Sequence, residues 1–199
     1  MGIKRVLATV LAATMLVGSA IGISADVTSP HGADIPVGTK KEVHSNSNVY
    51  YTGDTTTGQA TALKVDVLKN PQGDGVELEH FNVIGDGKNP LIVGDGLTKV
   101  RIKKKSTVKK NAFKGTNIKY IILHKGVTFE KDSLNGTKSK VYITIKNLTA
   151  AKGLKAKGKC GGKNVVVKIK KKVYKKLSPK QRKSFNKTVK KLGATVKKI

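Results

Sequence analysis

The side chains that most often carry catalysis or bind metals are few and scattered in this chain. Its four histidines are widely spaced, and the single cysteine, Cys160, excludes an intramolecular disulfide framework and any site built from several thiolates. Glu79-His80 has no second histidine at metalloprotease spacing, and no Gly-x-Ser-x-Gly elbow, P-loop or dinucleotide fingerprint occurs. We therefore expect a protein that is not an enzyme, with no catalytic residues, metal or cofactor, and with Cys160 as an inert thiol.

Three Gly-Asp-Gly triplets, at 73–75, 85–87 and 94–96, raise the question of calcium, because hard cations bind Asp oxygens on tight turns. The segment that begins at Asn70 starts like an EF-hand loop, but Phe81 stands at the twelfth position, where such a loop has a bidentate acid. The triplets also lack the tandem nonapeptide pattern of calcium β-rolls. We interpret them as plain turns.

Lysine is the one charged residue type that gathers. The chain of 199 residues has 40 Lys+Arg against 12 Asp+Glu, a formal charge of +28. Residues 26–98 hold ten acids and five lysines, whereas residues 99–199 hold 33 bases and two acids. Only Arg101 and Arg182 among those bases are arginine, the residue that binds phosphates and bases bidentately. The composition favours diffuse attraction to a polyanion over shape-specific recognition.

The first 25 residues have the features of a secretory signal peptide. Lys4-Arg5 precedes an apolar run from Val6 to Val17, and small residues end the segment at Ala25. The alternative is an uncleaved anchor, because Val6–Ala25 carries no charge and nearly spans a bilayer. Asp26 follows directly, where a stop-transfer signal would carry Lys or Arg, which favours cleavage. We expect a secreted or bacterial cell-surface protein with no membrane span after cleavage.

Composition divides the rest of the chain into three segments. Residues 26–48 are polar with little periodicity and are expected to form a disordered leader. Residues 49–96 are expected to form a small acidic β region, because short runs in them alternate apolar and polar residues. Residues 97–199 form a lysine-rich domain.

Within the acidic region, one predicted strand has Leu63, Val65 and Val67 on one side. Residues 70–75 are rich in Asn, Pro, Gly and Asp, so we predict a hairpin loop there. A second alternating strand is predicted at 76–81.

The lysine-rich domain contains a repeat. An offset of 21 residues places two sets of apolar positions on each other: Leu97, Val100 and Ile102 on Ile118, Ile121 and Leu123. A period in the twenties is typical of a solenoid, in which each apolar-x-apolar step is a short strand and stability comes from stacking. We predict two stacked coils over 97–137, with strands 100–102 and 121–123 paired in parallel. Phe113 and Leu134 should be buried at equivalent places.

The fuller pattern consists of two sets: Leu97, Val100, Ile102, Val108 and Ala112-Phe113-Lys114-Gly115, then Ile118, Ile121, Leu123, Phe129 and Leu134-Asn135-Gly136. It resembles the BspA-like leucine-rich repeat family of secreted bacterial surface proteins. Thr116 and Thr137 stand where the family usually has Cys, and Lys103 and His124 where it usually has Pro. The resemblance implies a curved, parallel-stranded solenoid used for attachment or ligand binding, without catalysis.

The C-terminal end reads as a strand–helix–strand unit between Val165 and Val196. Ser178-Pro179 followed by Gln181 is a capping-box helix start. The apolar face of this helix consists of Phe185, Val189 and Leu192, with Gly193 as the stop. We predict a terminal cap, as repeat arrays need. The expected fold class is thus β-rich α+β: a short leucine-rich-repeat-like parallel solenoid with this cap, preceded by a small β region.

Two further apolar-x-apolar strands, at 143–145 and 167–169, extend the alignment. The aligned strands bring together outward or following positions that include five cations: Arg101, Lys103, Lys146, Lys168 and Lys170. Neighbouring strands lie about 4.8 Å apart, so adjacent unit charges repel by about 0.9 kcal/mol even in bulk water. We predict a polyanion-binding face there. The alternative is that these lysines extend into solvent and keep an exported protein soluble.

Three function classes remain. The first is an exported, non-enzymatic surface protein that binds anionic wall polymers, glycans or a protein partner, for adhesion or wall association. The alternative is an exported basic nucleic-acid-binding protein, which the charge favours but which scarce arginine and 5% aromatic residues oppose. The third is an exported enzyme with an unrecognised site in residues 49–96.

Overall fold

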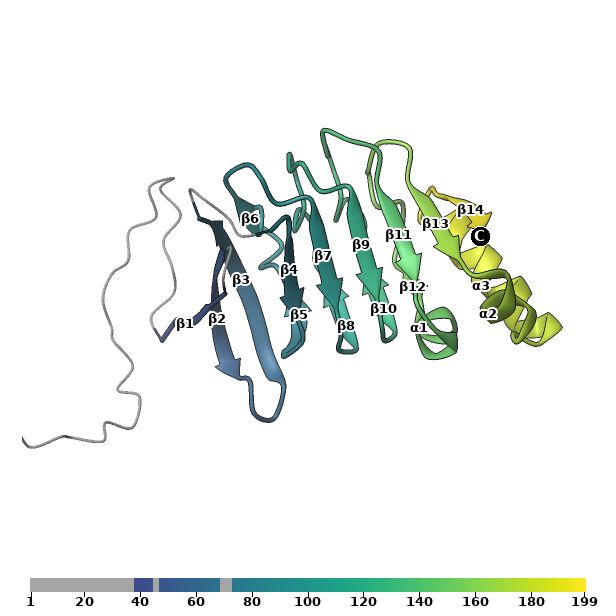
Figure 1. Ribbon diagram of the computed structural model, residues 1–199, viewed down its shortest axis with the longest axis horizontal. Helices are drawn as coiled ribbons and strands as arrows, with labels where there is room; N and C mark the ends of the chain where they lie inside the picture. Colours follow the sequence, from purple (N-terminus) through teal and green to yellow (C-terminus); the bar gives the residue numbers. More distant parts are fainter. Residues whose placement is uncertain (1–37, 45–46, 69–72) are drawn as a thin grey trace, which may run out of the picture.

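The chain forms two β-sheets whose strands follow one another along a single long axis, with helices at the C-terminal end (Figure 1). The computed structural model describes residues 38–44, 47–68 and 73–199. The expected signal peptide, residues 1–25, lies outside the described residues, as does most of the leader. Lys40–Val43 and Ser47-Asn48, within the segment expected to be disordered, form strands.

The first sheet has the order β1-β2-β3-β5-β8-β10-β12, and β6 also pairs with β3. Its strands are β1 (Lys40–Val43), β2 (Ser47–Asp54), β3 (Gln59–Val67), β5 (Phe81–Ile84), β6 (Ile92–Val93), β8 (Ser106–Val108), β10 (Val127–Phe129) and β12 (Lys155–Ala156). The second sheet has the order β14-β13-β11-β9-β7-β4. Its strands are β4 (Gly75–Leu78), β7 (Lys99–Ile102), β9 (Tyr120–Leu123), β11 (Tyr142–Ile145), β13 (Val166–Ile169) and β14 (Thr195–Lys198). The helices in the described part of the chain are α1 (Leu148–Gly153), α2 (Lys171–Lys175) and α3 (Pro179–Lys191).

From β4 onward the chain passes from one sheet to the other and forms a parallel β-solenoid of about four turns. Strands β7 and β9 pair in parallel, with Val100 beside Ile121 and Ile102 beside Leu123, as the repeat predicts. The same register continues into β11 and β13, so the alignment of all four strands made from the sequence is confirmed.

The coil interior is filled by the residues that the repeat marks as inward. Phe113 and Leu134 are both fully buried, and each is tied to the next coil: the Phe113 N–H donates to the Ser133 carbonyl at 2.9 Å, and the Leu134 N–H to the Cys160 carbonyl at 2.7 Å. The backbone repeats as well, since Asn111 and Asp132 have φ of 62° and 59°. The predicted equivalence of the two coils is therefore confirmed.

The solenoid begins one coil earlier than the repeat indicates. Strand β4 pairs in parallel with β7, placing Val76 beside Val100 and Leu78 beside Ile102. The predicted hairpin over 70–75 is wrong, because β3 lies in the first sheet and β4 in the second. The predicted strand at 76–81 is also divided at Glu79-His80, where the chain crosses from β4 to β5. The 21-residue offset does not detect this coil, because 24 residues separate Val76 from Val100.

Strand β3 has a bulge that changes its alternation. Its pairing with β2 runs from Tyr50 beside Lys64 to Tyr51 beside Ala62, which leaves Leu63 as the extra residue. Ala62 and Val65 are fully buried, whereas Leu63 is only partly buried. The prediction that Leu63 shares a face with Val65 is therefore wrong, because one inserted residue moves the side chains before it to the other face.

The C-terminal segment has two helices, α2 and α3, between β13 and β14, where the sequence predicted one. Helix α3 begins at the predicted capping box, in which the Ser178 side chain accepts from the Gln181 N–H and the Gln181 side chain accepts from the Ser178 N–H. Its apolar residues Phe185, Val189 and Leu192 are buried. The chain then turns and adds β14 in parallel to β13 at the end of the second sheet.

Replacement of Phe113 by Ala should lower the free energy of unfolding by about 3–5 kcal/mol, because it leaves a large void in a fully buried position. Denaturant unfolding followed by circular dichroism measures the change. Val43→Ala is the control, since the Val43 side chain is 68% exposed. An unchanged unfolding midpoint for Phe113→Ala would contradict the assignment of this side chain to the core.

Replacement of Gly126 by Ala should destabilise the fold by about 1–3 kcal/mol, because a methyl group there would lie 2.7 Å from the Gly153 Cα, a backbone atom of the next coil. Gly158→Ala is the matched control, because the nearest atom to its methyl group, the Lys131 Cβ, lies at 3.1 Å and needs to move by only a few tenths of an ångström. Thermal unfolding of both variants checks the result. Equal midpoints would show that the coils are not packed this closely.

Candidate functional site

The outer surface of the second sheet carries the residues expected to bind polyanions. Side chains alternate along each strand, and the register aligns the outward ones in rows across the sheet. The middle row consists of Glu77, Arg101, Ile122, Thr144, Lys168 and Lys197. The end row, directly after the strands, consists of Glu79, Lys103, His124, Lys146 and Lys170. Backbone hydrogen bonds from Lys103 to Leu78, His124 to Ile102 and Lys146 to Leu123 keep the end row in register.

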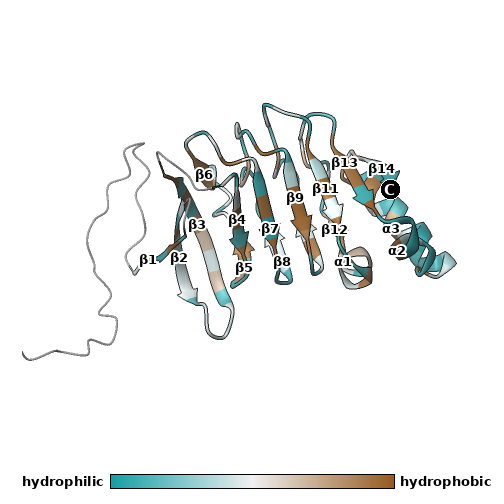
Figure 2. Cartoon of the chain, in the orientation of Figure 1, coloured by the Kyte–Doolittle hydropathy of each residue, from teal (hydrophilic) through white to brown (hydrophobic). Residues whose placement is uncertain are grey.

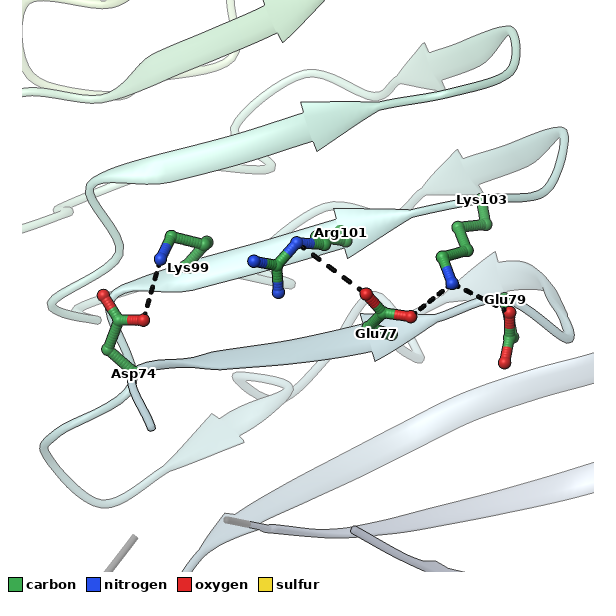
Figure 3. Close-up of polar contacts among 6 residues, drawn as sticks. All are labelled: Asp74, Glu77, Glu79, Lys99, Arg101 and Lys103. Carbon is green, nitrogen blue, oxygen red and sulfur yellow. Dashed lines mark hydrogen bonds and ion pairs between the residues drawn. The ribbon is translucent and has the colours of Figure 1, made fainter. Parts of the chain in front are cut away.

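Acids from the first coil meet the first cations of these rows (Figure 3). The Lys103 ammonium lies between the carboxylates of Glu77 and Glu79, at 3.3 Å from Glu79. Arg101 Nε is 3.7 Å from Glu77. At the start of the strands, the Lys99 ammonium donates to Asp74 at 2.8 Å.

These contacts divide the five expected cations into two groups. The hydrogen bond from Lys103 lowers the pKa of Glu77, and its partner carboxylates raise the pKa of Lys103, so both groups are charged at neutral pH. Arg101 and Lys103 thus already have anionic partners. The sequence does not predict these ion pairs, because Glu77 and Glu79 become neighbours of β7 only through the first coil, which the 21-residue repeat does not detect.

At the C-terminal end of the second sheet, the outward lysines have no carboxylate partner among the described residues. Lys146 and Lys170 are neighbours in the end row, and Lys168 lies beside Lys197 in the middle row. We call these four residues the lysine quartet. Within the described residues, no ion pair links any of them to a carboxylate, and Lys146, Lys170 and Lys197 are exposed. Lys197 is the member that sequence analysis missed; the signal is Val196-Lys197, which repeats the alternation of Val167-Lys168.

An apolar strip, formed by Tyr120, Ile122 and Tyr142, lies between the acidic and the cationic ends of the second sheet. Strand β9 is hydrophobic along most of its length (Figure 2), and Ile122 is its outward residue in the middle row. In the row before it, the rings of Tyr120 and Tyr142 stack with centroids 5.8 Å apart and planes at 17°. The Lys168 ammonium lies 3.6 Å from the centre of the Tyr142 ring, and Lys140 lies 5.6 Å from it. The strip is therefore continuous with the lysine quartet.

His124 occupies the end row between Lys103 and Lys146. Partial burial lowers its pKa, and the neighbouring cations Lys146, Lys103 and Arg101 act in the same direction, against the opposing effect of Glu77. The imidazole is therefore neutral at pH 7. In the neutral form it adds no charge to the row.

The Asp residues of the Gly-Asp-Gly triplets, considered as metal ligands, and Cys160, considered as a nucleophile, contact other groups of the protein. The Asp carboxylates of the triplets accept protein donors: Asp86 from the Lys88 and Asn89 amides, Asp95 from Asn117, and Asp74 from Thr98 and Lys99. Across the described residues, no group of three or more His, Cys, Asp or Glu side chains is placed to hold a metal ion. Cys160 is buried, its thiol lies 3.1 Å from the Leu192 carbonyl, and burial raises its pKa.

On the first sheet, one ionic cluster joins residues that directly follow the strands of three successive coils. Glu130 follows β10, and Lys109 and Lys157 follow the neighbouring strands β8 and β12. Both ammonium groups lie 3.0 Å from the same Glu130 oxygen, and the Lys110 N–H donates to the other oxygen at 3.2 Å. One of the two acids in the lysine-rich segment therefore links three successive coils.

No helix in the described part of the chain is both long and apolar enough to cross a membrane. No family model, curated protein or solved structure matches this chain.

Replacement of Glu130 by Gln should lower the free energy of unfolding at pH 7 by about 1–2 kcal/mol. Burial raises the pKa of Glu130, but hydrogen bonds from the Lys109 and Lys157 ammonium groups and the Lys110 N–H together outweigh it, so the pKa in the folded protein is lowered. Above the ordinary pKa of about 4.5, the ionised Glu130 stabilises the folded protein. As the pH falls below that value, the unfolded chain takes up the proton first, and the stabilisation is lost between the ordinary pKa and the lower pKa of the folded state.

Urea unfolding at pH values between about 3 and 7 tests this prediction. The Gln variant should show a flatter decline in stability below about pH 5 than the parent. Asp95→Asn is the control, because the Asp95 side chain is 79% exposed. Parallel pH profiles for the parent and Glu130→Gln would contradict the assigned role of Glu130.

Proposed function

We propose that this protein is an exported, non-enzymatic repeat protein that binds anionic polymers through the lysine quartet at the end of its second sheet. The observation that carries the proposal is the adjacency of four lysines without a carboxylate partner among the described residues. Neighbouring strands lie about 4.8 Å apart, and residues two apart along a strand about 6.6 Å apart. Like charges at these spacings repel one another, and an anionic ligand would relieve that repulsion.

The proposal revises the site predicted from the sequence. Lys146, Lys168 and Lys170 remain in it, and Lys197 joins them. Arg101 and Lys103 contribute less, because a ligand would have to compete with Glu77 and Glu79 for them. Binding should therefore depend mainly on the C-terminal strands β11, β13 and β14.

The cellular location and role in this proposal are supported by the sequence. The signal-peptide features of residues 1–25 support export, and the resemblance to the BspA-like leucine-rich repeat family supports a surface role in adhesion or wall association. In this interpretation the coils are leucine-rich-repeat-like, and β13, α2, α3 and β14 form a terminal cap. A protein partner with an acidic surface would use the same cations.

Nucleic acid is the alternative anionic ligand. The charge of the segment favours it, but arginine, which recognises phosphates and base edges bidentately, is scarce. Steep loss of affinity with salt is expected for any polyanion. The comparison of ligands at one salt concentration therefore separates the two functions.

Replacement of Lys146, Lys168, Lys170 and Lys197 by Gln should weaken heparin binding at least about tenfold and reduce its salt dependence, because fewer counterions are released. The matched control replaces Lys183, Lys187, Lys190 and Lys191 on α3, which are also exposed, and removes the same charge from a different surface. Fluorescence anisotropy with labelled heparin and labelled duplex DNA across a salt series measures both sets.

Equal losses for the two sets would mean that the lysines act only through total charge and that the quartet is not a site. Retained heparin affinity in the quartet variant would contradict the proposal directly. Stronger binding of duplex DNA than of heparin at the same salt concentration would favour the nucleic-acid alternative.

A further inference from the structure

The apolar strip beside the lysine quartet has no role in the core. The inward residues of the same strands, such as Ile121 and Ile143, are fully buried, whereas Tyr120, Ile122 and Tyr142 alternate with them on the outer face. In the described part of the chain, Tyr120 is one of four large hydrophobic side chains that are exposed, at 37%. A surface designed only for solubility would carry charged residues at these positions.

Contacts join the strip to the quartet in one continuous surface. Tyr120 stacks on Tyr142, and the Tyr142 ring lies against the Lys168 ammonium at 3.6 Å. Lys168 in turn is the register neighbour of Lys197. From β9 to β14 this surface covers three strand spacings, about 14 Å, which is longer than a single sugar ring.

A ligand that fits this surface needs two properties at once. It needs anionic groups for the lysines, and it needs C–H surface together with hydroxyl groups for the tyrosines, whose rings are apolar and whose hydroxyls both donate and accept hydrogen bonds. A polyphosphate has only the first property. A polysaccharide of acidic sugars has both.

We propose that the ligand is an anionic polysaccharide, with sugar rings packed against Tyr120, Ile122 and Tyr142 and its acidic groups on the lysine quartet. This inference rests on the proposed function and adds the class of ligand and the residues that select it. Tyr120 and Ile122 supply contacts that do not depend on charge, and Tyr142 holds Lys168 beside them.

The sharpest test is Tyr120→Ala in the full chain, because Tyr142, and not Tyr120, makes the contact with Lys168. The probes are polygalacturonate and inorganic polyphosphate of similar charge. We expect about tenfold weaker binding of polygalacturonate and less than about twofold change for polyphosphate. Because the lost contact releases no counterions, the polygalacturonate affinity should fall equally at every salt concentration, leaving the salt slope unchanged.

Two further variants separate recognition from folding. Tyr120→Phe keeps the ring and should retain most of the polygalacturonate affinity, while Tyr120→Thr removes the ring but keeps a residue that favours strands. Thermal unfolding of each variant establishes that the solenoid is intact. Loss of polygalacturonate binding in Tyr120→Thr at an unchanged unfolding midpoint supports the proposal.

Unchanged polygalacturonate binding in Tyr120→Ala and Tyr120→Thr overturns the inference, as does an equal loss for polyphosphate. A loss confined to single-stranded DNA, added as a third probe, would also overturn it and assign the tyrosines to base stacking. In each of these cases the quartet variant decides the proposed function separately. If that variant binds every probe as well as the parent does, the proposed function itself is wrong.

Discussion

The structure depends on one constraint, the exact parallel register between successive coils of the second sheet. Each inward pair, such as Ile121 and Leu123, lies directly beside the pair of the next coil, and backbone hydrogen bonds hold this arrangement across six strands. Apolar burial drives the stacking, since one coil cannot bury its own faces. Because the same register aligns the outward positions, the composition of the surface rows follows from the packing of the core.

This coupling explains how a strongly basic segment tolerates cations on adjacent strands. At the first coil, Glu77 and Glu79 pair with the cations of β7, and on the first sheet Glu130 is shared by Lys109 and Lys157. In the middle of the second sheet, Ile122 and Thr144 interrupt the row of charges. Within the middle and end rows, neighbouring lysines without a carboxylate partner among the described residues lie at the C-terminal end.

The sequence was most informative where the pattern is periodic. The apolar-x-apolar steps at 100–102, 121–123, 143–145 and 167–169 predict the observed register, even though the coils differ in length. The capping box at Ser178 likewise predicts the start of α3, because it is a local signal.

The remaining features depend on contacts that a local pattern does not contain. The coil of β4 and β5 escaped detection because the long segment between Gly85 and Gly96 changes the spacing, and the acidic partners of Lys103 were missed with it. The bulge at Leu63 depends on pairing with β2 and reverses the side-chain alternation of the strand. For the candidate site, the sequence therefore predicted the face and three of the four quartet lysines, but not their neutralised neighbours.

The segregation of charge along the solenoid axis gives the molecule a large electric dipole moment. Ten of the 12 acids lie in residues 26–98, whereas 33 of the 40 basic residues lie in residues 99–199. In the field of an anionic surface, such a dipole exerts a torque before any contact forms, and it turns the C-terminal strands toward that surface. The protein would therefore arrive end-on, with β14 leading and the β1–β3 end pointing outward. At moderate salt this alignment acts only within about 10 Å of the surface, the distance over which ions screen the field.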